Sequence, residues 1–290
     1  MDGIILINKE KEWSSHDVVN KVKRLLNEKV GHTGTLDPLA TGVLPLLIGK
    51  GTLCSKYLIN HDKTYKVKLE LGKKTETADS EGKIVEEKEV SRDIFNKDFL
   101  NMTLKKFIGK QEQIPPIYSA IKVNGKKLYE YARSGKDVKV EPRKIEIYKI
   151  DLLDFDVDNK QIMFEVSCSK GTYIRSLCED IAKKLGTVGF MRELQRTQVG
   201  EFKLEDTVRI KELEENVMNT EFFELNFISI EKLFNQKDKI DLDNKKLELF
   251  LNGVKLSCNN LDEIYRIYNN DKFIGIGVVK NKLLKRDVIL

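Results

Sequence analysis

The chain has 290 residues, and 40% of them are hydrophobic, which is enough for one large or two ordinary globular domains. Lysine and arginine number 51 against 46 aspartates and glutamates, so the net charge of +5 allows a polyanionic partner without demanding one. Only three histidines occur, which excludes a multi-histidine metal centre and disfavours a histidine-based triad. Chemistry must therefore rest on carboxylate, Tyr, Lys or Arg side chains.

The cysteines and the hydropathy favour the cytoplasm. The four cysteines show neither CxxC spacing nor pairing with histidine, which predicts reduced thiols: Cys54, Cys168, Cys178 and Cys258. No apolar run reaches the roughly 18 residues of a membrane span, and the first residues lack a signal-peptide pattern. We expect a cytoplasmic protein with no membrane partner.

The first part of the chain reads as strand, helix, loop and strand. GIILINKE predicts a buried strand, and Ser14 followed by Asp17 predicts the capped start of a helix that runs to about Lys29. The loop GHTGTLDPLATG then leads into the apolar run VLPLLIG. From Thr64, TYKVKLELG alternates apolar and charged residues, which predicts a strand with one buried face.

The middle of the chain predicts three strands and two helices around a basic excursion. A Ser-Glu-Gly turn precedes the strand IVEEKEV, and the apolar spacing from Phe95 to Phe107 predicts a helix. Residues 114–148 contain prolines, an Asn-Gly turn, tyrosines and many basic residues, which predicts a projecting segment rather than core. Beyond them, IEIYKIDLLDF and IMFEVSCS predict strands, and SKGTYIRSLCEDIAKKLG predicts a glycine turn into a helix.

The last part predicts a second, smaller unit. Residues 235–244 are polar and predict a linker, and KKLELFLNG predicts a short helix. EIYRIYNNDKFIGIGVVKN and LLKRDVIL then predict short strands with a hairpin turn at Asn269 to Asp271. We therefore expect two domains, residues 1–235 and a small C-terminal β-barrel of residues 236–290.

Asp37 is the first candidate for chemistry. An Asp before a Pro is common in ordinary turns, so a structural role is one interpretation. The functional interpretation is that Pro38, nearby glycines and the apolar run hold the carboxylate in fixed geometry. As a lone carboxylate, Asp37 could be a metal ligand, a general acid or base, or a nucleophile. Three carboxylates stay open as partners without any spacing that singles them out: Glu10, Glu12 and Glu76.

Three further features have both a structural and a functional interpretation. Tyr65 is on the buried face of its strand, where packing is the default. Arg175 follows Tyr173 at a helix start, where the positive helix end should make it prefer a carboxylate or phosphate, although a surface ion pair is an alternative. The basic stretch 118–143 is either a solvated hairpin or a phosphate-binding arm, with these basic residues: Lys122, Lys126, Lys127, Arg133, Lys136 and Lys139.

Four motifs occur in the order GHTGTLDPLATGVLP, KTYKVKLELGKKTETADSEG, PPIYSAIKVNGKKLYEYARSG and CSKGTYIRSL. Together they resemble the TruB family of tRNA pseudouridine synthases, and the resemblance spans roughly residues 3–205. The C-terminal piece resembles the PUA-type RNA-binding barrel of that family. The resemblance implies an α+β pseudouridine synthase fold, a mixed and mainly antiparallel sheet flanked by helices.

The resemblance also implies the activity, which is conversion of uridine to pseudouridine at position 55 in the TΨC arm of tRNA, without cofactor, metal or guide RNA. Asp37 matches the family's catalytic nucleophile, Arg175 the Arg paired with it, and His32 the His that enters the RNA loop during base flipping. Residues 118–143 resemble the mobile thumb insertion that clamps the RNA arm. Three residues match the family's uridine pocket: Tyr65, Tyr173 and Leu194.

The implied roles agree with simple chemistry. A carboxylate can attack or assist at one carbon of the nucleoside without any electron transfer. Flipping the uridine costs a few kcal/mol, which stacking on Tyr65 and insertion of His32 could offset. An Arg beside Asp37 is expected to lower its pKa by about 1 to 3 units.

The chain departs from the family pattern in two places. NKEKEWSS lacks the usual Pro and Gly, which are replaced by Glu10 and Glu12, so the loop after Lys9 is expected to differ in shape. GFMRELQRT has Phe190 where His is usual and Gln195 where Arg often stands. We expect an active, stand-alone monomer that binds tRNA. The alternatives are a tRNA-binding or folding chaperone that acts independently of catalysis, and a guide-RNA-dependent synthase.

Overall fold

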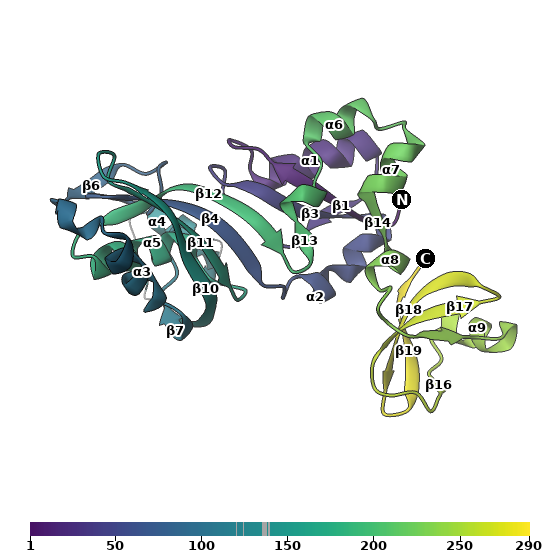
Figure 1. Cartoon of the computed structure of the whole chain (residues 1–290). Helices are drawn as coiled ribbons and strands as arrows, with labels where there is room; N and C mark the ends of the chain where they lie inside the picture. Colours follow the sequence, from purple (N-terminus) through teal and green to yellow (C-terminus); the bar gives the residue numbers. More distant parts are fainter. Residues whose placement is uncertain (120, 124, 135–137, 139) are drawn as a thin grey trace.

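A computed structural model describes the chain except residues 120, 124, 135–137 and 139 (Figure 1). Its centre is a ten-stranded mixed sheet in which β2 and β13 flank an eight-strand path. Neighbouring strands are antiparallel except β12 and β3, which confirms the expected mixed, mainly antiparallel sheet. The path runs β14 (Phe227–Ser229), β1 (Gly3–Lys9), β3 (Thr41–Ile48), β12 (Gly189–Val199), β4 (Lys63–Leu71), β11 (Gln161–Cys168), β10 (Arg143–Asp156) and β7 (Gly109–Gln113), with β2 (Val30–His32) on β3 and β13 (Phe202–Lys203) on β12.

The parallel contact between β12 and β3 is short and depends on one glycine. It joins Gln195 to Thr41 and Arg196 to Gly42. Gly42 has φ 103°, and a Cβ there would lie 2.1 Å from the carbonyl oxygen of Arg196. Glycine is therefore required at this position. The contact brings Arg196 next to the loop that precedes β3.

Helices cover the two halves of the sheet separately (Figure 1). Two apolar clusters of the sheet pack against them, one with α1 and α6 and one with α3 and α5. The first helix ends at Leu26 rather than near Lys29, because Asn27 adopts φ 52° and caps it. The main helices are α1 (Ser15–Leu26), α3 (Lys97–Lys105), α5 (Ile174–Lys184), α6 (Ile210–Glu215) and α7 (Thr220–Asn226).

Shorter elements connect these layers. The strands β5 and β6 form a hairpin, and the basic excursion contains β8, β9 and α4. Of the basic residues predicted in that excursion, Lys136 and Lys139 lie outside the described residues, as does Asn124 of the predicted turn. The bounds are η1 (Gly49–Cys54), α2 (Ser55–Leu58), β5 (Lys73–Thr75), β6 (Ile84–Glu87), η2 (Arg92–Ile94), β8 (Lys122–Val123), β9 (Lys126–Lys127), α4 (Leu128–Arg133) and η3 (Leu204–Asp206).

The C-terminal unit is a curled five-stranded sheet, which agrees with the predicted PUA-like fold (Figure 1). The predicted linker 235–244 is wrong in part, because β15 lies within it and pairs in parallel with β17. Asn270 and Asp271 have φ 48° and 60°, which confirms the hairpin turn between β17 and β18. The helix α8 (Ile230–Leu233) precedes this unit, whose elements are β15 (Lys239–Asp241), α9 (Asn244–Leu251), β16 (Leu256–Ser257), β17 (Ile264–Asn269), β18 (Lys272–Lys280) and β19 (Leu283–Ile289).

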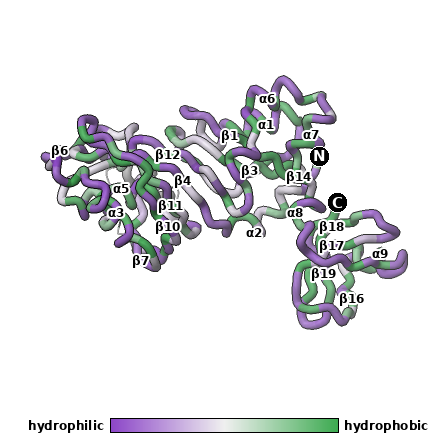
Figure 2. The backbone as a smooth tube through the Cα atoms, in the orientation of Figure 1, coloured by the Kyte–Doolittle hydropathy of each residue, from purple (hydrophilic) through white to green (hydrophobic). Residues whose placement is uncertain are grey.

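An apolar cluster and three side-chain hydrogen bonds join this sheet to the rest of the chain. Asp287 on β19 accepts hydrogen bonds from Tyr57 and Lys56 of α2. Tyr268 donates to Glu231 of α8 at 2.5 Å. Hydrophobic segments lie along the strands of both sheets (Figure 2), and the cluster between the units consists of Cys54, Ile230, Phe234, Ile276 and Val288. Among the described residues, no helix is long and apolar enough to cross a membrane.

Candidate active site

The loop that carries Asp37 is tied to the segment between β1 and α1. The ammonium group of Lys9 is fully buried and donates to the carbonyl oxygens of Pro38 at 3.2 Å, Glu10 at 2.9 Å and Trp13 at 2.5 Å. The backbone N–H of Glu12 donates to Pro38 O at 2.9 Å. Two independent hydrogen bonds therefore converge on the carbonyl oxygen of the residue that follows Asp37.

A second pair of ties fixes the residues before Asp37 and the strand after it. Ser15 Oγ accepts from the N–H of Leu36 at 2.8 Å and donates to its carbonyl oxygen at 3.0 Å. Arg196 donates through Nη2 to Gly34 O at 3.1 Å and through Nε to Val43 O at 2.8 Å. These bonds hold the backbone on both sides of Asp37, so its carboxylate has few ways to move.

The departure from the family pattern at Glu12 is visible in the backbone. Glu12 has φ 72°, the left-handed conformation that favours glycine. A side chain in this conformation costs about 1–2 kcal/mol, and the N–H that it orients is the one bonded to Pro38. At this residue the chain keeps a glycine-like backbone in spite of its side chain. Phe190, the other departure, is buried in β12.

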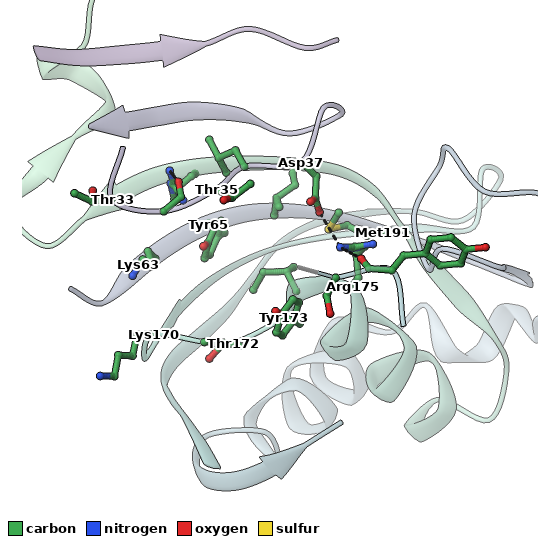
Figure 3. Close-up of a pocket in the computed structure, with 18 of the residues that line it drawn as sticks. Thr33, Thr35, Asp37, Lys63, Tyr65, Lys170, Thr172, Tyr173, Arg175 and Met191 are labelled. Carbon is green, nitrogen blue, oxygen red and sulfur yellow. Dashed lines mark hydrogen bonds and ion pairs between the residues drawn. The ribbon is translucent and has the colours of Figure 1, made fainter. Parts of the chain in front are cut away.

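Asp37 forms one arm of a carboxylate–guanidinium–carboxylate arrangement. Arg175 Nη2 lies 3.2 Å from Asp37 Oδ2 (Figure 3). Arg175 Nη1 lies 3.5 Å from Asp79 Oδ2. The guanidinium also donates to the carbonyl oxygens of Thr77 at 3.2 Å and Tyr118 at 3.0 Å. Arg175 is buried, so the alternative of a surface ion pair is wrong.

Asp79 was not among the residues that the sequence singled out. It is 3% exposed, and its Oδ1 accepts from the Thr77 hydroxyl at 2.5 Å and from the Glu81 N–H at 3.1 Å. A bridge between Asp79 and Met191 docks this turn on β12, far away in sequence. In the sequence Asp79 stands in a turn motif, TADSEG, whose only local signal is that of an ordinary Asp turn.

The pKa of Asp37 differs from the expectation. Burial raises it above the ordinary value of 3.8, and the charge of Asp79 raises it too, against the lowering effects of Arg175 and Lys9. Arg175 lowers the pKa of Asp37 as expected, but removal of the carboxylate from water and the second carboxylate outweigh this effect, so the pKa is raised overall. A carboxylate with a raised pKa is a stronger base than an ordinary Asp side chain.

A pocket of about 490 Å³ opens at Asp37 (Figure 3). Among its lining residues are four that the sequence predicted beside Asp37: Tyr65, Tyr173, Arg175 and Leu194. Tyr65 is 8% exposed, and Tyr173 caps the start of α5, where Gln113 bonds both its N–H and its carbonyl oxygen. The structure thus brings residues from β4, α5 and β12 together around one carboxylate.

His32 is the predicted site residue that does not line this pocket. It lies in β2, and its Nδ1 accepts from the N–H of Gly34 at 3.2 Å. Burial and the charges of Arg196 and His16 lower its pKa, so the imidazole is neutral near pH 7. It is half-buried at the edge of the loop that Thr33 and Gly34 continue into the pocket.

The arrangement can supply a nucleophile or a general base from one carboxylate. Its floor holds an aromatic ring, apolar side chains and a guanidinium, which suits a planar ring with polar edges. Within the described part of the chain, no group of three or more His, Cys, Asp or Glu side chains could hold a metal ion.

Comparisons with known proteins give the family. The model of the TruB family pseudouridylate synthase N-terminal domain matches residues 23–174, and that of the tRNA pseudouridylate synthase B C-terminal domain matches residues 175–229. The chain is 41% identical to tRNA pseudouridine synthase B of Francisella tularensis subsp. novicida, covering 100% of this chain and 97% of the relative. It is 43% identical to the protein of the same name from Clostridium tetani, covering 96% and 95%.

Comparison with solved structures gives the same fold. The chain is 25% identical to a chain of a Cbf5-Nop10-Gar1 complex, with a TM-score of 0.69 over 99% of this chain and 83% of the other. A chain of an H/ACA RNP bound to a substrate RNA containing 2′-deoxyuridine has the same fold, with 23% identity and a TM-score of 0.70 over 99% and 85%. The matched domains and the full-length relatives together place the chain in the TruB family, as a pseudouridine synthase that isomerises uridine in tRNA.

Proposed function

We propose that the chain isomerises the uridine at position 55 in the TΨC arm of tRNA, with Asp37 as the nucleophile and without guide RNA. The observation that carries the proposal is the Asp37–Arg175 pair, with 3.2 Å between Oδ2 and Nη2, at the base of the pocket described above. The loop ties at Pro38 and Leu36 support it, since they hold one carboxylate in fixed geometry.

The reaction needs one carboxylate and no external reagent. The bond between N1 and C1′ of uridine breaks, the base turns, a bond forms between C5 and C1′, and the proton lost from C5 is balanced by one gained at N1. Asp37 forms a covalent bond to the sugar or the base and is released at the end, or it starts an elimination at the sugar. Arg175 keeps the carboxylate aimed and partly compensates its charge.

The pocket accepts the uridine after base flipping. Tyr65 provides an aromatic surface for stacking, and Tyr173 and Leu194 enclose the base. His32 enters the RNA loop in place of the flipped nucleotide, which its position at the edge of the Asp37 loop allows. Stacking and insertion together offset the few kcal/mol that flipping costs.

The remaining segments bind the tRNA. Residues 118–143 act as a thumb that clamps the TΨC arm, and residues 236–290 form an RNA-binding domain beside the catalytic domain of residues 1–235. The five-stranded C-terminal sheet and the basic residues around the excursion support this division. We expect a monomer that works in the cytoplasm.

The test is to incubate the protein with an unmodified tRNA transcript and map pseudouridine. Wild type should convert the TΨC-loop uridine, Asp37→Asn should give no product while binding tRNA nearly as well, and Asp154→Asn, an exposed carboxylate on β10, should behave as wild type. Absence of product at that uridine with wild type refutes the proposal. Loss of binding together with activity in Asp37→Asn counts against a tRNA-binding role separate from catalysis.

A further inference from the structure

The charged residues that line the pocket are unbalanced. They comprise one carboxylate, Asp37, and four cations: Lys63, Lys170, Arg175 and Arg196. Arg175 is engaged by Asp37 and Asp79. Among the described residues, the other three cations have no carboxylate within ion-pair distance. Their charge is left for something that enters the pocket.

Two of these cations are withdrawn from water. Arg196 is 1% exposed, and its partners are neutral: the carbonyl oxygens of Gly34 and Val43, and the side chain of Tyr65. Lys63 is half-buried at the start of β4 and donates to the carbonyl oxygen of His61. Burial of a cation without an opposite charge is costly, so it favours an anionic ligand at this place.

The unpaired cations are close to one another and lie away from the catalytic carboxylate. Burial, Arg196 and Lys170 lower the pKa of Lys63, and Cys168 and Asp62 raise it, with a net lowering. A Cβ on Gly34 would lie 3.5 Å from Arg196 Nη1 and 4.0 Å from Lys63 Cε, so both cations flank this glycine. Figure 3 shows Lys63 and Lys170 at the end of the pocket opposite Asp37. Thr33, on the same wall, has a buried hydroxyl without a hydrogen-bond partner among the described residues.

We propose that Lys63 and Lys170, with Arg196 behind them, form a subsite for one of the two phosphodiester groups that flank the flipped uridine. Lys63 is the direct ligand, because its ammonium group has donors left beyond the bond to His61. Lys170 lies at the exposed rim, where its Nζ donates to Asn60 Oδ1 at 2.6 Å and adds attraction from outside. The inference rests on the proposed function, since it assumes that a nucleotide enters this pocket.

The subsite explains how the pocket can orient the nucleotide that it accepts. Stacking on Tyr65 fixes the plane of the ring but not the direction of the strand. A phosphate held at the cationic end, with C1′ at Asp37, fixes that direction. The contact acts on the backbone, so it positions the nucleotide without reading its sequence.

The test measures binding of an RNA hairpin with the TΨC-arm sequence in an Asp37→Asn background, where the RNA is not converted. Lys63→Met should raise Kd roughly 10- to 100-fold, as for loss of a charge-assisted hydrogen bond, and lower the slope of log K against log salt by about 0.7. Lys66→Met is the matched control, because Lys66 lies on the same strand, is exposed and does not line the pocket. Thermal unfolding of each variant shows whether it is folded.

A second arm identifies the phosphate. Each hairpin carries one neutral methylphosphonate linkage, either 5′ or 3′ of the target uridine. The nucleotide before that linkage has a 2′-deoxy sugar. The reference is a hairpin with the same 2′-deoxy sugar and phosphate at every linkage. One of the two neutral linkages should raise Kd for the Asp37→Asn protein that retains Lys63. With that hairpin, the Kd should no longer differ between this protein and the one that also carries Lys63→Met. The subsite is overturned if the Lys63→Met protein is folded and its Kd and salt slope are unchanged. It is also overturned if the Kd difference between the proteins with and without Lys63→Met persists with both neutral linkages. Conversion of the all-ribose hairpin without methylphosphonate by wild type tests the proposed function separately, since the binding measurements do not depend on it.

Discussion

Asp79→Asn separates the two carboxylates that share Arg175. The substitution keeps the shape of the side chain, and Oδ1 can still accept from Thr77 and from the N–H of Glu81. It removes the negative charge 3.5 Å from Arg175 Nη1 and presents an amide N–H₂ to a guanidinium that donates only. Among the described residues, Asp37 is then the single carboxylate partner of a buried cation.

The distance sets the size of the effect. Two unit charges 3.5 Å apart attract by about 5 kcal/mol at an effective dielectric constant of about 20. Much of this is offset because Asp79 no longer has to lose its hydration, so we expect the free energy of unfolding to fall by roughly 1–3 kcal/mol. Arg175 also loses an orienting contact, and a displacement of about 1 Å at the reacting carboxylate should lower kcat about 100-fold.

The pH dependence gives the sharper assay. Asp79 raises the pKa of Asp37 and Arg175 lowers it. If Asp37 must be ionised to react, Asp79→Asn should move the acid limb of the kcat/KM profile to lower pH, and Arg175→Met should move it to higher pH. The profiles would come from single-turnover conversion of a tRNA transcript between pH 4 and 8. Acid limbs that move in the same direction in both variants refute the reasoning, because then the limb does not report the ionisation of Asp37.

Three further predictions concern the residues that hold the site. Burial lowers the pKa of Lys9 from 10.5 to about 8, so between these pH values the unfolded chain binds more protons than the folded one. This group should therefore make the free energy of unfolding rise with pH in that window. Lys9→Met should remove the rise, as measured by urea titrations at pH 8 and 10. Glu12→Gly should stabilise the fold by about 1 kcal/mol through relief of the positive φ, seen as a higher urea midpoint with unchanged m; a loss of stability would show that φ 72° is not strained. Arg196→Lys should lower the free energy of unfolding by roughly 2–4 kcal/mol, since at least one buried carbonyl oxygen loses its donor. As a control, Arg192→Lys on the exposed side of the same strand should change it by less than about 0.5 kcal/mol.

Most of the helices and strands were predicted from the sequence, because the patterns that indicate them lie within each segment itself. Alternation in TYKVKLELG gives β4 with Tyr65 on its buried face, and the Ser14–Asp17 capping box starts α1. The strand β15 inside the predicted linker was missed because three residues pair in parallel with β17, some 27 positions later, and carry no alternation of their own. Pairing with a distant strand can make a polar segment into an edge strand.

The site was predictable in part for the same reason. Asp37 and Arg175 stand in motifs that point to them, and the helix-start position of Arg175 called for an anionic partner. Asp79 lies 42 positions after Asp37, and only the docking of its turn on β12 brings it to Arg175. Its effect on the pKa of Asp37 therefore depends on tertiary structure, and so does the burial that dominates that pKa.

Arg196 shows why the fold and the chemistry cannot be separated in this pocket. Its guanidinium joins the Asp37 loop at Gly34 to the following strand at Val43, and it contacts Tyr65 from a third segment. The short parallel contact of β12 with β3, which only glycine at position 42 allows, sets its place. Arg196 is therefore needed for loop geometry, and because no carboxylate among the described residues neutralises it, the same residue leaves positive charge under the pocket. Arg196, which holds the loop in place, therefore also makes the pocket positive. That charge attracts a backbone phosphate of the RNA without a separate residue for this purpose.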